Sequence, residues 1–362
     1  ACFMFFVEAK SDEPTFGVFL SALFLLGTGF TFLQIAANPL VAQLGSEETS
    51  SSRLNLSQAF NSLGTTLAPV IGGYFVFKYF GENAQGASAV QIPYLILASV
   101  LFILAGIIFF AEIPNIGANA NDIDEDPVGA LKHPNLVFGM FGIFCYVGGE
   151  VTIGSNLVSL MKESHGMAEL QASSLLSFYW GGAMIGRFMG SISMSNLPKT
   201  KKYLTMAFVG IAAFYLITYI TNVSLQETIY YMMFLVLNFV VFILAKSVPS
   251  RTLGMFAIVN IALIIIMLTT QGAVSLWTIL SVGLFNSIMF SNVFTLGIQG
   301  LGKYTAQGSS LLVMMILGGA VVPPLQGLLA DNLGPQIAFA VPLACYAYLA
   351  WYGFVGCNLR KQ

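Results

Sequence analysis

The chain has 362 residues, of which 57% are hydrophobic and only 8% are charged, and its mean hydropathy is +0.82. This composition excludes an ordinary soluble domain, because repeated apolar runs of about 20 residues have the length that crosses about 30 Å of hydrocarbon. The formal net charge is −2 and no stripe of basic residues is present, which excludes a nucleic-acid-binding protein of the usual basic kind.

Eleven apolar segments are long enough to span a membrane. A backbone in lipid must satisfy its polar groups within the segment, and no segment alternates apolar and polar residues, so we expect helices and not strands. The first apolar stretch, ACFMFFVEA, is too short to span, and we expect it to be the end of a helix whose start is missing. The expected spans lie near residues 17–43, 53–80, 91–112, 135–161, 171–196, 203–221, 227–245, 252–270, 274–299, 308–330 and 336–357.

The basic residues predict which helix ends face the cytoplasm. When the turn at residues 44–52 is assigned to the cytoplasm, that side carries 11 lysine and arginine residues and the other side carries 3. This asymmetry agrees with the positive-inside rule. The longest polar stretch, residues 113–133, then becomes a solvated cytoplasmic linker. We therefore expect an N-terminal bundle over residues 1–112, which lacks its first helices, and a C-terminal bundle over residues 134–362.

The two expected bundles share a pattern of glycine and proline. Gly64, Pro69 and Gly73 stand at offsets of 0, 5 and 9, and the same offsets recur in the second bundle. The matching set there is Gly318, Pro323 and Gly327. Because both helices have the same predicted orientation, the pattern favours parallel repeats about a pseudo-two-fold axis along the membrane normal, an architecture of secondary transporters.

Glu150 is the one acidic residue expected deep inside a span. A charge at that depth costs about 3 kcal/mol on insertion scales, and we expect no lysine or arginine within reach to neutralise it. The carboxyl is therefore expected to take up a proton or to bind a polar group of a ligand. The alternative is a structural carboxyl that is hydrogen-bonded between two helices.

Carboxamides form a second polar group in the first half. Gln34 and Asn38 lie one helical turn apart in FLQIAANPLVAQLG, so both project from one face. In the next span, Asn55, Gln58 and Asn61 recur at intervals of three. Because a carboxamide both donates and accepts hydrogen bonds, this set suits sugar hydroxyls better than a charged ligand. The alternative is helix–helix association, worth about 0.6 kcal/mol per hydrogen bond.

The second half adds two amides and several aromatic rings. Asn286 lies in VGLFNSIMFSNVF, and Asn292 follows nearer the predicted cytoplasmic end. Aromatic rings in these spans are expected either to stack on the apolar face of a sugar ring or only to pack between helices. The rings concerned are Tyr146, Tyr179, Trp180 and Phe290.

Two arginines lie near the predicted cytoplasmic ends of their helices, Arg53 in the first half and Arg187 in the second. Each is expected either to extend to the membrane interface or to act as a latch between helices on that side. The four cysteines and two histidines lack metal-ligand spacing, so we expect no metal and no other cofactor. The sequence also lacks the motifs of a membrane hydrolase.

Six stretches carry a resemblance to sugar permeases of the major facilitator superfamily, in the group of fucose permeases and glucose/galactose transporters. They are LQIAANPLVAQLG, SSRLNLSQAFNSLGTTLAPVIGGY, CYVGGEVTIGSNLV, FYWGGAMIGRF, GLFNSIMF and YTAQGSSLLVMMILGGAVVPPLQGLLAD. The resemblance covers nearly the whole chain and is most specific in residues 31–75. It implies proton-coupled uptake of a monosaccharide across a bacterial inner membrane.

The chain also departs from this family in several places. Fucose permeases carry glutamate where this chain has Gln34 and glutamine where it has Glu150, whereas the glucose/galactose branch resembles this chain at both positions. Asn61 matches an asparagine of the family's cavity, and the family's first-helix aspartate would precede the first residue of this chain. Phe290 and the serine after it replace a frequent Tyr/Phe-Pro pair. Residues 203–245 look like an inserted helix pair, which would give the intact protein fourteen helices.

These observations predict a symporter of a hexose and a proton, of the glucose/galactose type, and not an enzyme. We expect a monomer in the bilayer, with a monosaccharide and a proton as its ligands and no nucleic acid as a partner. The alternatives are an L-fucose–proton symporter and, from another class, a membrane sensor that binds sugar without transporting it. Glu150 is also the expected site of proton coupling. The residues expected to bind the sugar are Gln34, Asn38, Asn61, Asn286, Glu150, Tyr146 and Phe290.

Overall fold

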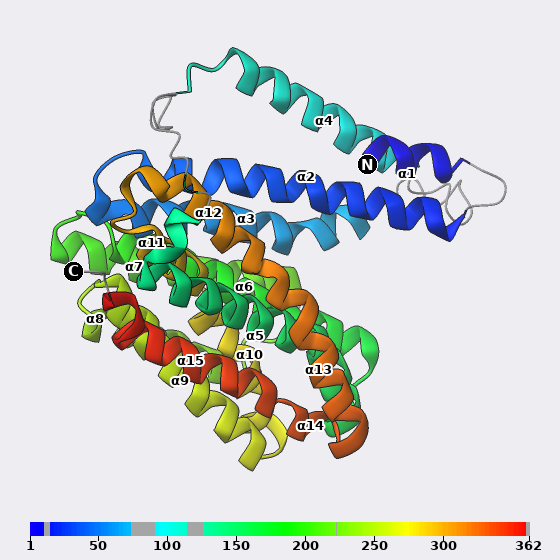
Figure 1. The fold of residues 1–362 in the computed structure, drawn as a ribbon. Helices are drawn as coiled ribbons and strands as arrows, with labels where there is room; N and C mark the ends of the chain where they lie inside the picture. The colour runs from blue at the N-terminus through cyan, green and yellow to red at the C-terminus, as the bar shows by residue number, and fades with distance from the viewer. Residues whose placement is uncertain (11–14, 74–90, 114–125, 127, 222, 360–362) are drawn as a thin grey trace. The chain divides into compact units, whose positions relative to one another are not determined.

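The computed structural model is helical in the part of the chain that it describes, and helices occupy the described part of each of the eleven expected segments (Figure 1). Residues 74–80 of the second expected segment lie outside the described residues. The described residues are 1–10, 15–73, 91–113, 126, 128–221 and 223–359. The helices are α1 (Cys2–Glu8), α2 (Phe16–Gln43), α3 (Ser50–Gly73), α4 (Gln91–Phe110), α5 (Pro134–His165), α6 (Glu169–Ser193), α7 (Lys199–Thr221), α8 (Ile229–Leu244), α9 (Pro249–Thr269), α10 (Gly272–Asn286), α11 (Met289–Ile298), α12 (Thr305–Met314), α13 (Gly318–Leu333), α14 (Pro335–Ala338) and α15 (Ala340–Phe354).

Length and apolar composition identify most of these helices as membrane spans. Within the described residues, eight helical segments are long and apolar enough to cross a membrane, and α8 is apolar but shorter. The helices α3 and α6, of 24 and 25 residues, are long enough but more polar. Their polar residues include the serines, amides and arginine that form the candidate site.

The chain divides into two units, each with its own packing. The smaller unit contains residues 1–37 and 64–117, and the larger unit contains residues 38–63 and 118–362. The larger unit therefore combines the end of α2 and the start of α3 with the second half of the chain. Most of the expected linker, residues 113–133, lies outside the described residues, so the predicted bundle boundary stays a prediction.

Aromatic packing holds α1 against α4 in the smaller unit. The ring of Phe5 stacks on that of Tyr94, with centroids 4.5 Å apart, and also contacts Phe19 at the start of α2. Gln91 at the start of α4 donates a hydrogen bond to the backbone carbonyl of Ala9 over 2.8 Å. The short first helix is thus fixed by one stacked ring pair and one hydrogen bond to the backbone.

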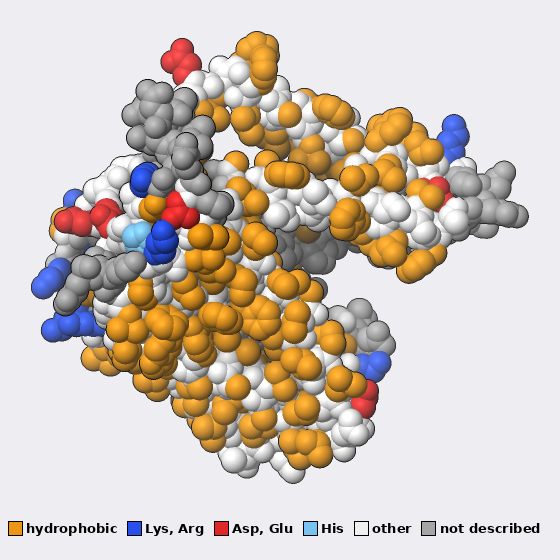
Figure 2. All heavy atoms as spheres, in the orientation of Figure 1, with side chains coloured by type: hydrophobic (Ala, Val, Ile, Leu, Met, Phe, Trp, Pro, Cys, Tyr) orange, Lys and Arg blue, Asp and Glu red, His pale blue; other side chains and the backbone are white. Residues whose placement is uncertain are grey.

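In the larger unit, α5 packs against α11, α13 and α15, while α6 packs against α7 and α10 and α9 packs against α10 and α15 (Figure 1). Glycines permit the closest of these approaches. A Cβ atom on Gly318 of α13 would lie 2.0 Å from the backbone oxygen of Phe144 in α5, and one on Gly283 of α10 would lie equally close to that of Tyr179 in α6. Large hydrophobic side chains cover much of the visible face of this unit, as expected for contact with lipid (Figure 2).

The helices α7 and α8 correspond to the expected inserted pair, residues 203–245. They pack against α6 and α10 and carry exposed apolar side chains such as Phe208 and Met233. Their buried polar groups bond to backbone carbonyls, Tyr231 to Phe178 over 2.8 Å and Asn238 to Leu284 over 3.0 Å. That this pair is an insertion, and that it contributes nothing to a central cavity, stay predictions.

The span that includes α10 and α11 is interrupted in its middle. The first helix ends at Asn286 and the second begins at Met289, so two residues, Ser287 and Ile288, lie between them. All four residues are buried. Both intervening residues keep right-handed helical angles, with φ −47° and ψ −50° at Ser287 and φ −94° and ψ −4° at Ile288, so the interruption is a local distortion of one span.

Two glycines of α13 test the role of close packing. Gly318→Ala should destabilise the protein by about 1–3 kcal/mol, because the added methyl group meets backbone that must move. Gly327→Ala in the same helix is the matched control, since nothing lies within 4 Å of its added carbon. Thermal unfolding of the purified variants should show a lower midpoint for Gly318→Ala alone. Equal midpoints would contradict the packing described here.

Candidate functional site

A buried ion pair connects α5 and α6 in the larger unit. The distance from Arg187 Nη2 to Glu150 Oε1 is 3.2 Å, and the two side chains are 10% and 11% exposed. The same Nη2 group also donates to the hydroxyl of Tyr146, one helical turn before Glu150, over 3.1 Å. Glu150 and Tyr146 were both predicted as site residues, and the structure brings them together around one guanidinium.

The expectation that no cation could reach Glu150 was wrong. Arg187 lies six residues before the end of α6, which is about 9 Å along a helix. A long arginine side chain was expected to extend to the interface from that position, but it turns inward and pairs with Glu150. The sequence located both charges and did not determine which way the arginine side chain points.

The guanidinium of Arg187 also binds two other elements. Its Nε donates to the backbone oxygen of Ser287, in the break between α10 and α11, over 3.1 Å. Its Nη1 donates to the hydroxyl of Ser62 in α3. One side chain therefore joins α6 to α5, to the α10–α11 break and to α3, and these bonds satisfy a buried charge that would otherwise be strongly destabilising.

A second polar network, centred on Asn286, reaches the backbone of Glu150. The amide oxygen of Asn286 accepts from Tyr346 over 2.7 Å and from Asn260 over 2.9 Å. Its Nδ2 donates to the hydroxyl of Tyr179 over 2.8 Å, and this hydroxyl donates to the carbonyl of Glu150 over 2.8 Å. Asn286 thus uses most of its bonding capacity on protein groups, and in this structure it orients Tyr179.

Sequence reasoning missed two members of this network, Asn260 and Tyr346. Both are fully buried, and the Oδ1 atom of Asn260 has no hydrogen-bond partner in the described part of the chain. Asn260 could have been predicted as a buried polar site residue, because it is an amide at the centre of an otherwise apolar span. Tyr346 gave none, because tyrosines are common in such helices.

The other predicted site residues lie in several places. Phe290 is buried, with its ring centroid 6.3 Å from that of Tyr146. Asn38 is buried, its Oδ1 accepts from Gln58 over 3.4 Å, and its Nδ2 has no partner among the described residues. Asn61 is exposed on α3 and immediately precedes Ser62. Gln34 belongs to the smaller unit, so the structure does not place it against this network.

Three polar contacts join the start of α3 to α6 and α11. The hydroxyls of Ser51 and Thr295 are 2.7 Å apart, and Ser52 donates to the backbone oxygen of Ser191 over 2.6 Å. The third contact runs from Asn55 Nδ2 to the oxygen of Asn292 over 3.4 Å. All three lie toward the end predicted to face the cytoplasm, where they hold the first half of the chain against the second.

Arg53, one of the two predicted gating residues, stabilises the turn between α2 and α3. It donates to the backbone oxygens of Val41, Ala42 and Ser46 over 3.1, 2.6 and 3.0 Å. Unpaired carbonyls at a helix C-terminus are a favourable place for a cation. The structure therefore gives Arg53 a role at the end of α2, and its role as a gate stays a prediction.

Apolar helices long enough to span a membrane and a buried charge pair between two of them are features of a membrane transporter. The chain belongs to the Major Facilitator Superfamily, whose model matches residues 1–253. It is a multi-pass membrane protein of a transporter family, not an enzyme. The expected family and fold class are thereby confirmed.

Particular relatives agree with this assignment. The chain is 39% identical to the glucose/galactose transporter of Brucella abortus over 357 residues, which cover 97% of this chain and 74% of that protein. It is 25% identical to the L-fucose-proton symporter of Escherichia coli over 379 residues, with the same coverages. The crystal structure of the transporter FucP in the outward conformation matches with a TM-score of 0.75 at 24% identity, covering 100% of this chain and 80% of that one.

The ion pair yields a direct test. Arg187→Gln alone should lower the free energy of unfolding by about 3–5 kcal/mol, because it leaves Glu150 buried without its cation. The double variant with Glu150→Gln should recover much of that loss, since both charges are then gone. Arg251→Gln, at an exposed position of α9, is the control for losing one positive charge. Additive effects of the two substitutions on the unfolding midpoint would show that the pair is not coupled.

Proposed function

We propose that this protein transports a hexose together with a proton across a bacterial inner membrane by alternating access. The buried pair of Glu150 and Arg187 is the observation that carries the coupling part of this proposal. Membership in the superfamily and the 39% identity to a bacterial glucose/galactose transporter support the substrate class and the membrane.

The choice of a neutral sugar is supported by the chemistry of the buried polar groups. Around the ion pair they are amides and phenols, which donate and accept hydrogen bonds without a net charge. Two buried atoms without a partner in the described residues, Asn38 Nδ2 and Asn260 Oδ1, could bind a hydroxyl oxygen and a hydroxyl hydrogen respectively. The predicted sugar-binding residues are kept in the proposal as Gln34, Asn38, Asn61, Asn286, Glu150, Tyr146 and Phe290.

Proton coupling is assigned to Glu150. A proton on its carboxylate removes the negative charge that Arg187 faces across 3.2 Å. The same guanidinium bonds to Ser62 of α3, so the protonation state of Glu150 affects a contact between the first and second halves of the chain. One charge that moves inward through 100 mV yields about 2.3 kcal/mol, enough for roughly a 50-fold sugar gradient.

In this mechanism the contacts at the start of α3 close the cytoplasmic side. Ser51, Ser52 and Asn55 hold α3 against α6 and α11. Opening toward the cytoplasm would require these contacts to separate, together with the bond between Ser62 and Arg187. Arg187 then acts as the predicted latch, and Arg53 keeps the α2–α3 turn rigid while α3 moves.

An L-fucose–proton symporter is the second candidate, because the chain is 25% identical to such a protein over 97% of its length. The two candidates share one mechanism and differ in the sugar. Uptake of labelled glucose, galactose and L-fucose by proteoliposomes distinguishes them. A sensor that binds sugar without transporting it would show no uptake and no counterflow of any of the three.

The coupling role of Glu150 is tested by Glu150→Gln. Glutamine resembles the protonated carboxyl and cannot lose its proton, so the variant should retain sugar counterflow and lose most accumulation driven by a pH gradient. Glu163→Gln, at the exposed end of α5, is the matched control and should behave like the parent protein. Full accumulation by Glu150→Gln would contradict the proposal.

A further inference from the structure

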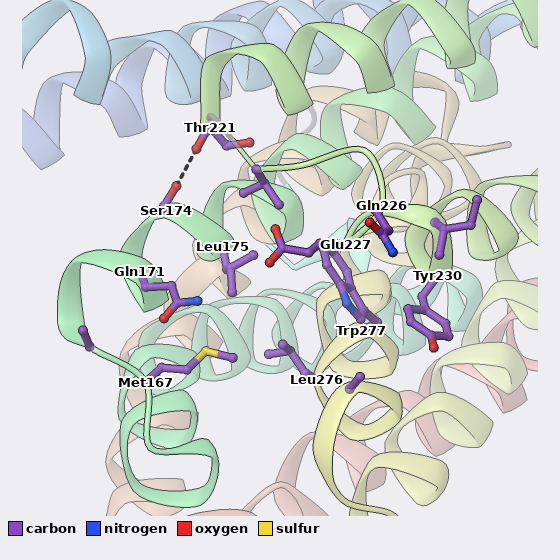
Figure 3. A pocket seen from close by; sticks show the side chains of 14 residues that line it. Met167, Gln171, Ser174, Leu175, Thr221, Gln226, Glu227, Tyr230, Leu276 and Trp277 are labelled. Atoms are coloured by element: carbon purple, nitrogen blue, oxygen red, sulfur yellow. Dashed lines mark hydrogen bonds between the residues drawn. The ribbon is translucent and has the colours of Figure 1, made fainter.

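A cavity of about 880 Å³ lies at the end of the larger unit predicted to face away from the cytoplasm. It is bordered by the start of α6, the start of α10 and the connection between α7 and α8 (Figure 3). One wall therefore comes from the helix pair that looks inserted. This volume is within the range of small-molecule sites in proteins, and none of the residues of the ion pair lines it.

The cavity contains polar groups that are not used by the protein itself. Gln171, Gln226 and Tyr230 line it at its exposed side, where their side chains are open to solvent, and none of the three bonds to another residue in the described part of the chain. Glu227 uses Oε2 to accept from Ser224, over 3.0 Å from its hydroxyl and 3.3 Å from its backbone N–H. Figure 3 shows Gln171 and Glu227 pointing into the cavity from opposite walls.

The lining also determines what kind of ligand fits. Among the described residues that line the cavity there is no lysine, arginine or histidine, so these residues offer no cationic partner to a phosphate or a carboxylate. Two amides, a phenol and a carboxylate match a ligand with several hydroxyl groups, which donate to the carboxylate and exchange hydrogen bonds with the amides. The ring of Tyr230, which is 44% exposed, offers apolar surface to the C–H face of a sugar, whereas Trp277 and Leu276 are buried and line the cavity with only a small part of their surface.

We propose that this cavity, lined by Gln171, Gln226, Glu227, Tyr230 and Trp277, is a second saccharide-binding site on the outer side of the membrane, distinct from the site near Glu150. This second site rests on the proposed function in one respect, which is that hexose transport decides the sugars to be tested. Its geometry is independent of the ion pair.

The direct test is protection of an engineered cysteine by sugar. Ala273 lines the cavity at the start of α10, and Ala273→Cys would be labelled with a membrane-impermeant maleimide in proteoliposomes, with and without saturating glucose or galactose. We expect sugar to slow labelling by about threefold or more. The parent protein measures background from the four native cysteines. Asn332→Cys, exposed at the end of α13, a helix that contributes no residue to the lining, should be labelled at a rate that sugar does not change.

Substitutions in the lining identify the groups that bind. Adding Glu227→Gln to the labelled protein should raise the sugar concentration needed for protection about tenfold, because hydrogen bonds to a charged group are the stronger ones. Adding Glu150→Gln should leave protection unchanged. If Ala273→Cys does not fold, Ile229→Cys, another lining residue at the start of α8, provides the same measurement.

Two results would overturn this site. One is labelling that neither sugar slows at either position. The other is protection by choline and not by sugar, because a carboxylate beside aromatic rings can also bind an organic cation. If the protein shows sugar counterflow but sugar does not protect the cysteine, the second site is disproved and the proposed transport stands. If sugar protects the cysteine but the protein shows no counterflow, the proposed transport is disproved and the second site stands.

Discussion

The structure around the candidate site depends on one buried ion pair. Glu150 and Arg187 lie on neighbouring helices with little access to water, where an unpaired charge would be strongly destabilising. Each ion is tolerated because the other is present, and because Tyr146, Ser62 and the carbonyl of Ser287 accept the remaining donors of the guanidinium. Such a pair is stable when complete and sensitive to a single proton.

Close helix packing makes these bonds geometrically possible. The backbone of α6 approaches α10 at Gly283, and this approach brings Tyr179 within 2.8 Å of Asn286. Gly186, the residue before Arg187, lies against Ser287 and the carbonyl of Leu284 at the end of α10. A larger residue at these positions would separate the helices and lengthen the hydrogen bonds of both polar networks.

Most helices of the described part of the chain were predictable, because apolar length reveals a membrane span. The burial of Glu150 was predictable from its place inside such a span. The partner of Glu150 was not, because Arg187 lies 37 positions away and the direction of a long side chain depends on the packing of other helices. Asn286 was correctly recognised as a buried polar residue, but the protein itself occupies its oxygen, through Asn260 and Tyr346.

The serines at the start of α3 show a second limit of sequence reasoning. Ser51 and Ser52 occupy the first turn of their helix, where serine is common for local reasons. Their contacts with Thr295 and with the carbonyl of Ser191 appear only when helices distant in sequence are packed together. Pairing between distant helices, rather than the identity of any one helix, is the information that the amino-acid pattern lacks.

The coupling of sugar to a proton at Glu150 can be measured most directly as proton uptake on sugar binding. If a proton favours sugar binding, linkage requires that sugar favours proton binding by the same factor. Purified protein in weakly buffered solution should therefore take up protons when glucose or galactose is added, and Glu150→Gln should bind the sugar without this uptake. Equal proton uptake by the parent protein and by Glu150→Gln would show that another group carries the proton.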